Sequence, residues 1–457
     1  MGTTRQLAEF VVGTSFADFP PDTSRLTKEL FLKFIADTVA GSSEPVGRKI
    51  IRYVREHRSS PESGVICGAF RTCADSAALA NGTLAHAAEL EDDQFPGTIG
   101  TVWVWPPILS IAQKFNLSGR DVITAAILGW EVTARLAIAG EPGTVHSGIC
   151  PASWYGVIGA TAGVAKLIEL DIEQTINAMS IAASHSHGLL AQTGTGAHLL
   201  EAGITSRSAV MSALLAKERV TGQPDILERR PGGLFMVIGE GKYDERKVTE
   251  GLGKSPFNVH QIQVKKYPCC FSTHRVIDAF IAALRENKIE SEDIEKVDVG
   301  VNKVDADVCN RPVKTSADSR FSFHHTLAGI MVEGKVDLTT FLEDKLNDPR
   351  FVRARDKVNV YINPDPPQAS AGVCHVTVVT KGKKKFHKEL AQAIGGTLYP
   401  LTTEQMIALY KQYTSGILPD RIQDRIAEMV LNLEKQPDVS ELMELLTFRQ
   451  LSTDRTR

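Results

Sequence analysis

Residues 151–170 read PASWYGVIGATAGVAKLIEL and contain small residues at helical spacing, among them Gly156, Gly159 and Gly163. Small side chains on one face let two helix axes approach closely. The stretch follows no clear strand and lacks both the Lys-Ser/Thr end of a P-loop and a GxGxxG pattern, which argues against a nucleotide-binding loop. We therefore interpret residues 156–170 as a central helix packed on other helices.

The segments around this helix have the same character. Apolar residues recur at helical spacing, and Gly or Pro residues separate the runs. The ranges expected to be helical are 24–40, 74–89, 121–138, 172–190 and 203–218. The first 260 residues are therefore predicted to be mainly helical.

After about residue 262 the pattern changes. A helix at 275–287 precedes alternating, β-branched runs at 296–304, 357–363, 372–380 and 384–389, and helices return at 403–413, 420–435 and 439–446. This order predicts a mainly α fold: a large all-helical domain, formed by residues 1–262 plus 396–457, with a smaller α+β domain inserted at 263–395. A cleft between two such domains is a common place for a small-molecule site.

Composition excludes several classes of protein. The 457 residues carry 51 Lys+Arg against 54 Asp+Glu, a net charge of −3, so we expect no nucleic-acid or membrane-surface partner. Apolar stretches such as 102–111 and 122–130 are too short to span a membrane. The start, MGTTRQLAEF, has no secretory signal pattern, and the seven cysteines form no CxxC pair. We expect a soluble, cytoplasmic protein with reduced thiols.

A first candidate cluster is AHAAELEDDQFPGT at residues 85–98, which contains His86, Glu89, Glu91, Asp92 and Asp93. Four carboxylates within five positions repel one another, and a solvated helix end is the favoured interpretation. The functional alternative is that one carboxylate, beside a cation, acts as a base or a hydrogen-bond acceptor.

Two further clusters surround the glycine-rich helix. His146 and Cys150, in TVHSGICPAS at 144–153, indicate either an anion pocket at a helix N-terminus or an ordinary loop. The segment ASHSHGLLAQTGTGAH at 183–198 predicts a polar functional loop, of which His198 is the most interesting member. Because His185 and His187 are two residues apart, they do not share a helix face, and a zinc pair is not expected.

The last two clusters lie in the predicted α+β domain. VKKYPCCFSTH at 264–274 provides a cation for a carboxylate and candidate acids or bases, and SRFSFHHTLA at 319–328 is either a capped helix start or a substrate-binding segment. Their candidate residues are Lys265, Lys266, Tyr267, Cys269, Cys270 and His274, then Arg320, His324 and His325. The sequence has no GxSxG, P-loop or HExxH motif. The five clusters suit proton transfer on an anionic substrate, with no metal or cofactor expected.

The order of these motifs resembles the MmgE/PrpD family over nearly the whole chain. The motifs are LAEFVVG, ALANGTLAHAAELEDD, SWYGVIGATAGVAKLIEL, AMSIAASHSHG, KKYPCCFSTHRVIDA and RFSFHHTLA. The resemblance implies a large helical domain, a smaller α+β lid domain and a homodimer. It also implies an enzyme acting on a small polycarboxylate, since the family includes 2-methylcitrate dehydratase, cis-aconitate decarboxylase and iminodisuccinate epimerase.

The resemblance assigns site residues by position. The implied catalytic set is Glu89, His198, Lys265, Cys270 and His325. The implied substrate-binding set is His86, Asp93, His146, Cys150, Lys266, Tyr267, His274 and Arg320. Six positions depart from the pattern that the resemblance implies for the decarboxylases. These have a Thr at Asp93, a His at Ile99, Cys150 and Cys270, a Lys at His198 and a Tyr at His325.

These departures decide the expected reaction. A decarboxylase must protonate the carbon that loses carbon dioxide, and Ile99 cannot do so. Epimerisation of an iminodisuccinate-like substrate is the first expectation, with His198 and a residue across the cleft, His325 or Cys270, exchanging the proton. A methylcitrate-type dehydratase is the alternative, followed by a cis-aconitate-type decarboxylase and a non-catalytic binding protein.

Overall fold

The computed structural model describes residues 2–95, 97–141, 143–238, 242–363 and 372–448, without the side chains of residues 99, 145 and 146. The chain forms two compact units, a larger one of Met1–Ile262 with Thr402–Arg457 and a smaller one of Gln263–Leu401. The fold is mainly helical, as predicted. The smaller unit extends to 401 instead of 395 because Val264 N–H donates to Gly395 O and Gly395 N–H donates to Tyr399 O.

The larger unit is a helical assembly with two short β-ribbons. Its longer helices are α1 (Thr3–Gly13), α2 (Pro21–Gly41), α3 (Pro45–Glu56), α4 (Ala74–Ala87), α5 (Trp105–Phe115), α6 (Gly119–Gly140), α8 (Pro151–Leu167), α9 (Ile172–Ala183), α10 (Gly196–Lys217), α19 (Thr403–Thr414), α20 (Asp420–Leu431) and α21 (Ser440–Leu446). Shorter helices are α7 (Gly143–His146), α11 (Leu234–Val237) and α12 (Arg246–Thr249). One pairs β1 (Ser63–Gly64) with β2 (Arg71–Thr72). In the other, β3 (Asp93–Gln94) pairs with β4 (Thr98–Ile99) on one side and with β5 (Ile262–Gln263) on the other, which makes it three-stranded.

Local sequence signals explain where several helices begin. Capping boxes start α6, α9 and α19, each with a polar N-cap side chain and a reciprocal acceptor three residues later. The central helix α8 begins at Pro151, five residues earlier than predicted, because proline at the first helical position has the right φ and needs no hydrogen-bond acceptor.

The glycines of α8 bring this helix against α6, as predicted from the sequence. A methyl group added at Gly159 would lie 2.4 Å from Gly129 O and 2.0 Å from Thr133 Oγ1 of α6. Real side-chain carbons do not approach backbone oxygens so closely. Glycine at 159 therefore sets the separation between these two helices.

The predicted polar loop at 183–198 is present between two helices, but its last residues, from Gly196 onward, belong to the second helix. Helix α9 ends at Ala183 instead of residue 190, and α10 begins at Gly196 instead of 203. The earlier start is explained by Thr195, the N-cap residue, whose hydroxyl accepts from His198 N at 3.4 Å. His198 therefore lies in the first turn of α10, on a rigid element.

Helices α4 and α10 touch through a reciprocal pair of glycines. A methyl group at Gly203 would lie 2.3 Å from Leu79 O, and one at Gly82 would lie 2.8 Å from Ala202 O. Each glycine thus gives room to the backbone of the other helix. The contact lies about one turn from His86 on α4 and from His198 on α10.

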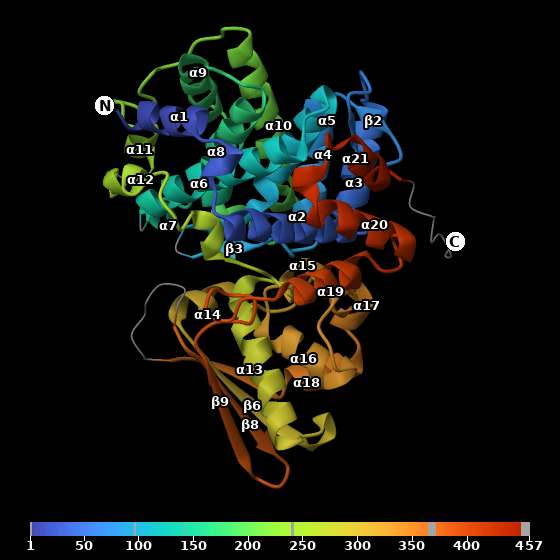
Figure 1. The fold of residues 1–457 in the computed structure, drawn as a ribbon. Coiled ribbons are helices and arrows are strands. Elements are labelled where there is room, and N and C mark those ends of the chain that lie inside the picture. Colours follow the sequence, from blue (N-terminus) through green and yellow to red (C-terminus); the bar gives the residue numbers. More distant parts are fainter. Residues whose placement is uncertain (1, 96, 142, 239–241, 364–371, 449–457) are drawn as a thin grey trace. The chain divides into compact units, whose positions relative to one another are not determined.

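The C-terminal helices complete the larger unit. Figure 1 shows α19 and α20, in red, beside α2, in blue. Thr403 Oγ1 donates to Glu29 Oε1 at 2.5 Å, and Lys28 Nζ lies 2.7 Å from Glu434 Oε2. Residues at the two ends of the sequence therefore belong to one core.

Helix α6 is long and apolar enough to cross a membrane by length and composition alone. However, 94% of its most apolar window is buried inside the structure. Burial to this extent is typical of a helix in the core of a folded protein.

The smaller unit is built on a four-stranded sheet of order β7–β6–β8–β9. Its strands are β6 (Ile294–Val301), β7 (Val358–Ile362), β8 (Cys374–Thr380) and β9 (Lys385–Leu390). β6 pairs parallel with β7 and antiparallel with β8, which pairs antiparallel with β9. The helices are α13 (Phe271–Asn287), α14 (Lys303–Cys309), α15 (Ser316–Ser319), α16 (Phe323–Glu333), α17 (Glu343–Leu346) and α18 (Pro349–Arg355).

Alternation along the central strands makes one face of this sheet apolar. Val297, Val299, Val376 and Val378 are buried in one core with Phe280 of α13. Figure 1 shows α13 running along the strands β6, β8 and β9. The opposite face carries the alternate residues of β8 and β9, among them His375, Thr377, His387 and Glu389.

Replacing Gly203 with alanine tests the contact between α4 and α10. Because the new methyl group would meet a backbone oxygen, the helices must separate, and we expect a loss of about 1–3 kcal/mol in the free energy of unfolding. Chemical denaturation measures this loss. The matched control is Gly13→Ala at the end of α1, where no atom lies within 4 Å of the added methyl group. Equal stability of the two variants would contradict the proposed role of Gly203.

Candidate functional site

Two histidines predicted from separate motifs meet in the larger unit. His86, in the last turn of α4, and His198, in the first turn of α10, have ring centroids 4.7 Å apart and planes inclined by 70°. The ring of His86 also lies edge-on to Trp103, with centroids 5.3 Å apart. The α4–α10 contact thus brings together two imidazoles that are 112 positions apart in the sequence.

Carboxylates surround both imidazoles. His86 Nε2 lies 4.0 Å from Glu89 Oε1 and 3.8 Å from Glu91 Oε1. On the other ring, His198 Nδ1 lies 3.1 Å from Glu201 Oε2, within hydrogen-bond distance. The structure therefore places general-base and general-acid candidates next to one another.

The acidic segment is buried, so its interpretation as a solvated helix end is wrong. Glu89, Glu91, Asp92 and Asp93 are between 1% and 5% exposed. The segment folds back over Lys33 of α2, whose Nζ donates to Leu90 O at 2.5 Å. This closure depends on a residue more than 50 positions earlier, which local spacing does not reveal.

Glu89 has an unusual backbone conformation. Its φ is +54°, in the left-handed region that favours glycine, and its N–H donates to His86 O at the end of α4. A residue other than glycine in this region carries strain of about 1 kcal/mol or more, and such residues cluster at functional sites. The strain supports a role for the Glu89 side chain.

The charges of the cluster act on His198. Burial by itself lowers the pKa of His198, but the hydrogen bond with Glu201 and the negative charges of Glu89, Glu201 and Glu91 outweigh it and raise the pKa above the ordinary 6.5. The surrounding carboxylates therefore favour the protonated form of this buried imidazole. An imidazolium of this kind can donate a proton to a leaving group.

Cys150 joins the cluster from the N-cap of α8. It shares with His198 and Glu201 a set of ligand atoms that all lie within 4.8 Å of one another. Burial, followed by the charge of Glu201, raises the pKa of the Cys150 thiol to about 12, so this residue is a neutral thiol. The neighbouring candidate His146 is the last residue of α7, and its side chain lies outside the described part of the structure.

Asp93 lies in the ribbon that follows the acidic segment. On β3 it is the direct partner of Ile99 on β4. The position to which the resemblance assigns a histidine in the decarboxylases is therefore opposite a buried acidic residue, and in this chain it is an isoleucine.

Sequence reasoning missed two members of this region. Lys33 is 1% exposed, pairs with Asp37 at 2.5 Å and lies 3.8 Å from Asp92. A Lys and an Asp four residues apart inside the apolar helix 24–40 were the available signal. Glu201 could have been found from its spacing to His198, since residues three apart share a helix face.

In the smaller unit, Lys266 and Tyr267 have an internal partner. Lys266 Nζ lies 2.7 Å from Asp278 Oδ1, and the Tyr267 hydroxyl donates to the same oxygen at 2.8 Å. Asp278 Oδ2 accepts from Ile394 N, which ties this network to the end of the unit. These contacts hold the start of the unit together, and substrate binding by either residue remains a prediction.

Three further candidates shape the segment before α13. Arg320 Nη1 donates to Pro268 O at 3.1 Å, and Cys270 N donates to Arg320 O at 3.0 Å. His274 is fully buried, stacks on Phe271 and lies with Nε2 3.2 Å from Cys269 O. Arg320 and His274 therefore have structural contacts with the turn that carries Cys270.

The thiol next to Cys270 is neutral. Burial raises the pKa of Cys269 to about 12, although Lys265 and Arg320 act in the opposite direction. The effect of Lys265 on this thiol shows that its charge lies near the turn. Catalytic roles for Lys265 and Cys270 remain predictions from the sequence.

His325 does not lie in a site that a substrate can use. It is fully buried on α16 between Phe341 and Phe351, with Nε2 2.9 Å from Thr340 O and Nδ1 3.3 Å from Arg355 Nη1. Burial lowers the pKa of His325 to about 4, so the ring is neutral. Both ring nitrogens contact protein groups, so neither is available to a substrate.

Three groups of side chains in the described part of the chain could hold a metal ion. In each group the ligand atoms all lie within 4.8 Å of one another. Two are buried parts of the cluster described above: His86 with Glu89 and His198, and Cys150 with His198 and Glu201. The third consists of His375, His387 and Glu389 in the smaller unit.

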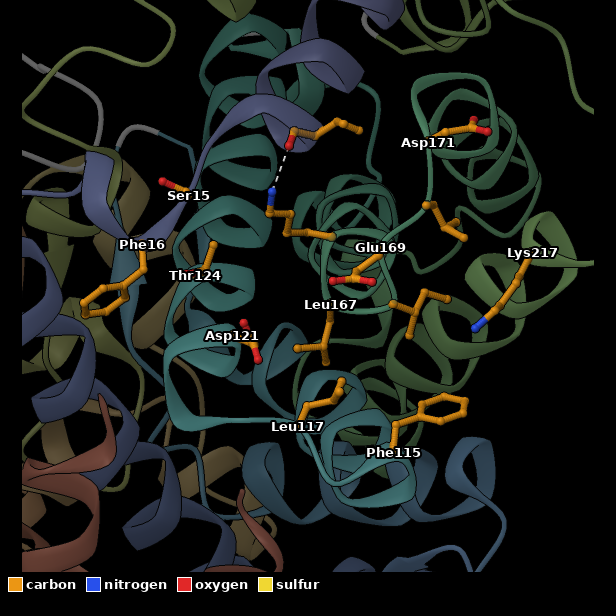
Figure 2. Close-up of a pocket in the computed structure, with 14 residues that line it drawn as sticks. Ser15, Phe16, Phe115, Leu117, Asp121, Thr124, Leu167, Glu169, Asp171 and Lys217 are labelled. Carbon is orange, nitrogen blue, oxygen red and sulfur yellow. Dashed lines mark hydrogen bonds between the residues drawn. The ribbon is translucent and has the colours of Figure 1, made fainter. Parts of the chain in front are cut away.

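A separate cavity of about 680 Å³ lies in the larger unit, near the ends of several helices (Figure 2). Its wall includes Phe16, Phe115, Asp121, Lys166 and Lys217, and charges of both signs line it. Lys166 Nζ donates to Val12 O at 2.8 Å. The cavity contains none of the candidate residues predicted from the sequence, so we do not assign the site to it.

Two family models match the chain and together cover most of it. The model of the MmgE/PrpD N-terminal domain matches residues 5–246. The model of the MmgE/PrpD C-terminal domain matches residues 267–435. The gap between them falls at the junction of the two units.

Curated relatives are similar at low identity over long stretches. Cis-aconitate decarboxylase of Mus musculus is 24% identical over 97% of this chain and 93% of its own length. Cis-aconitate decarboxylase of Aspergillus terreus is 25% identical over 97% of this chain and 96% of its own length. 2-Methylcitrate dehydratase of Escherichia coli (strain K12) is 23% identical over 73% of this chain and 71% of its own length.

His198→Gln tests whether the protonated ring of His198 stabilises the folded protein. Because folding raises the pKa of His198, the protonated ring stabilises the fold fully below about pH 6.5, and this contribution disappears as pH rises through the raised pKa. The difference in Tm between the parent and His198→Gln should therefore be largest at acid pH, about 1 °C per kcal/mol lost in a chain of this size. Thermal unfolding from pH 5.5 to 9 measures it.

Glu201→Gln is the companion variant for this test. It removes the hydrogen-bonded carboxylate, so the pKa of His198 should fall. The stabilising contribution of protonated His198 should then disappear at a lower pH than in the parent. A Tm difference that grows with rising pH would contradict the assignment.

Proposed function

Because the chain belongs to the MmgE/PrpD family, we propose that it is a lyase that acts on a small polycarboxylate by removing a proton next to a carboxylate. Relatives named cis-aconitate decarboxylase and 2-methylcitrate dehydratase support this proposal, since both names specify tricarboxylate substrates and lyase chemistry. Among the lyases, a hydro-lyase of the methylcitrate type is our first candidate.

The buried cluster of the larger unit carries the proposal. Glu89 and Glu91 provide carboxylates that can accept a proton from carbon, and the hydrogen bond with Glu201 helps to raise the pKa of His198, which favours the protonated ring. Elimination of water needs one group of each kind: a base for the carbon acid and an acid for the leaving hydroxyl. In this scheme Glu89 is the base, His198 is the acid and Glu201 positions His198.

Decarboxylation is the second candidate. Its support is the length of the match, since the decarboxylases are similar over 97% of the chain and the E. coli dehydratase over 73%. Against it stands Ile99, where the resemblance implies that the decarboxylases have their histidine. An aliphatic side chain cannot protonate the carbon that loses carbon dioxide.

Epimerisation of an iminodisuccinate-like substrate, the first expectation from the sequence, is not supported by these relatives, whose names describe lyases. It is retained as one outcome of the assay. Lys265 and Cys270 are retained as predicted participants from the smaller unit, with Lys265 as a ligand for a substrate carboxylate.

One assay separates the three reactions. The purified chain is incubated in deuterated water with 2-methylcitrate, citrate, cis-aconitate and a stereopure amino-polycarboxylate, and the products are followed by NMR and by carbon dioxide release. A new alkene without carbon dioxide supports the hydro-lyase. Carbon dioxide with an itaconate-like product supports the decarboxylase. Deuterium at the α-carbon with racemisation alone would contradict a lyase.

Glu89→Gln tests the base. The variant keeps the shape of the side chain and removes its charge, so we expect kcat/KM to fall by about 10²–10⁴-fold while Tm is retained. The matched control is Glu131→Gln on α6, another buried carboxylate, which pairs with Arg135 at 2.5 Å. This control should lower Tm and leave kcat/KM nearly unchanged. Full activity in Glu89→Gln would exclude Glu89 as the base.

A further inference from the structure

We propose that His375, His387 and Glu389 form a binding site for a late first-row divalent cation, with Zn²⁺ as the representative, on the open face of the sheet in the smaller unit. Each residue offers one ligand atom, and these atoms all lie within 4.8 Å of one another. The three residues belong to none of the motifs considered above, and the site is separate from the buried cluster of the larger unit.

The distances fit a cation shared by the three side chains. His375 Nδ1 and His387 Nε2 each lie 3.1 Å from the same oxygen, Glu389 Oε1. A tetrahedral zinc ion with bonds of about 2.0–2.1 Å separates neighbouring ligand atoms by about 3.4 Å. A cation could therefore enter between these atoms with small side-chain rotations and no movement of the strands.

The strand register brings the ligands to one face. His375 on β8 is the direct partner of Glu389 on β9, and Thr377 is the direct partner of His387. Side chains of alternate residues on paired strands point to the same side of a sheet. Figure 1 shows β8 and β9 as adjacent strands, with β9 at the edge. The hydrogen-bonded ladder thus holds the three ligands in place.

A neighbouring hydroxyl orients one of the imidazoles. Thr377 Oγ1 lies 2.9 Å from His387 Nδ1, which leaves Nε2 directed at Glu389. A hydrogen bond to the second ring nitrogen is the usual way in which proteins orient a metal-ligating histidine. Thr377 would therefore act as a positioning residue for His387.

The ligand set selects the kind of cation. Two imidazoles and one carboxylate suit zinc, copper, nickel and other late first-row ions, whereas calcium and magnesium prefer oxygen ligands. Because His387 and Glu389 are about half exposed, water can fill the remaining positions. The cation would link the edge strand β9 to β8 and thereby stabilise the sheet.

The sequence did not reveal this site because its ligands come from two strands. A spacing of twelve residues between two histidines matches no local zinc motif. CxxC and HExxH patterns describe ligands that are close together in the sequence, which these ligands are not. The register of β8 and β9 is the information that was missing.

Isothermal titration of the full chain with zinc chloride, after removal of metal by a chelator, tests the proposal. We expect His387→Ala and Glu389→Gln to lose the site, with affinity weakened at least about tenfold. Zinc should also raise the Tm of the parent chain, and this rise should be reduced in His387→Ala. The matched control is Lys385→Ala, on the same strand and the same face, which should bind zinc as the parent does.

The buried cluster is a competing site, so His198→Ala is titrated in parallel. Under the proposal, zinc binding that depends on His387 persists in His198→Ala. The proposal is overturned if the parent chain binds no zinc, or if His387→Ala and the parent bind it with the same stoichiometry and affinity. Lyase activity does not enter these measurements, so the two proposals can fail separately.

Discussion

The contact between Gly82 and Gly203 is the constraint on which the candidate site depends. Each glycine lies against the backbone of the opposite helix, so α4 and α10 approach more closely than side chains would permit. The two imidazoles extend from these helices about one turn from the contact, and their separation of 4.7 Å follows from it. In this protein, therefore, the residues without side chains determine where the reactive side chains meet.

Several charged side chains are buried near this contact. Glu89, Glu91 and Glu201 are each at most 5% exposed, and Lys33 and His198 are the cationic groups described beside them in the larger unit. Burying like charges together is unfavourable, and the positive φ of Glu89 adds strain. Proteins tolerate such arrangements at sites where activity requires them. The packing of the apolar helices must supply the stability that this region lacks.

Much of the fold could be predicted from the sequence because helices and strands have short periods. The glycine-rich helix, the change of pattern near residue 262 and the four strands of the sheet were found in this way. The site was harder to predict. Whether the acidic segment is solvated or buried depends on Lys33, and whether His198 lies in a loop or a helix depends on the cap at Thr195. His325 resembled a site residue but packs between phenylalanines, which only the tertiary structure decides.

The pairing of α19 with α2 has a consequence for the order of events during synthesis. Glu29 leaves the ribosome early, but its partner Thr403 is 374 residues further along the chain. At about 5–20 residues per second, the ribosome needs about 20–75 s to make the residues between them. During that interval the apolar face of α2 lacks part of its cover, while the smaller unit, whose residues are contiguous, can fold. The contacts of α2 with α19 therefore form only after most of the chain has been made.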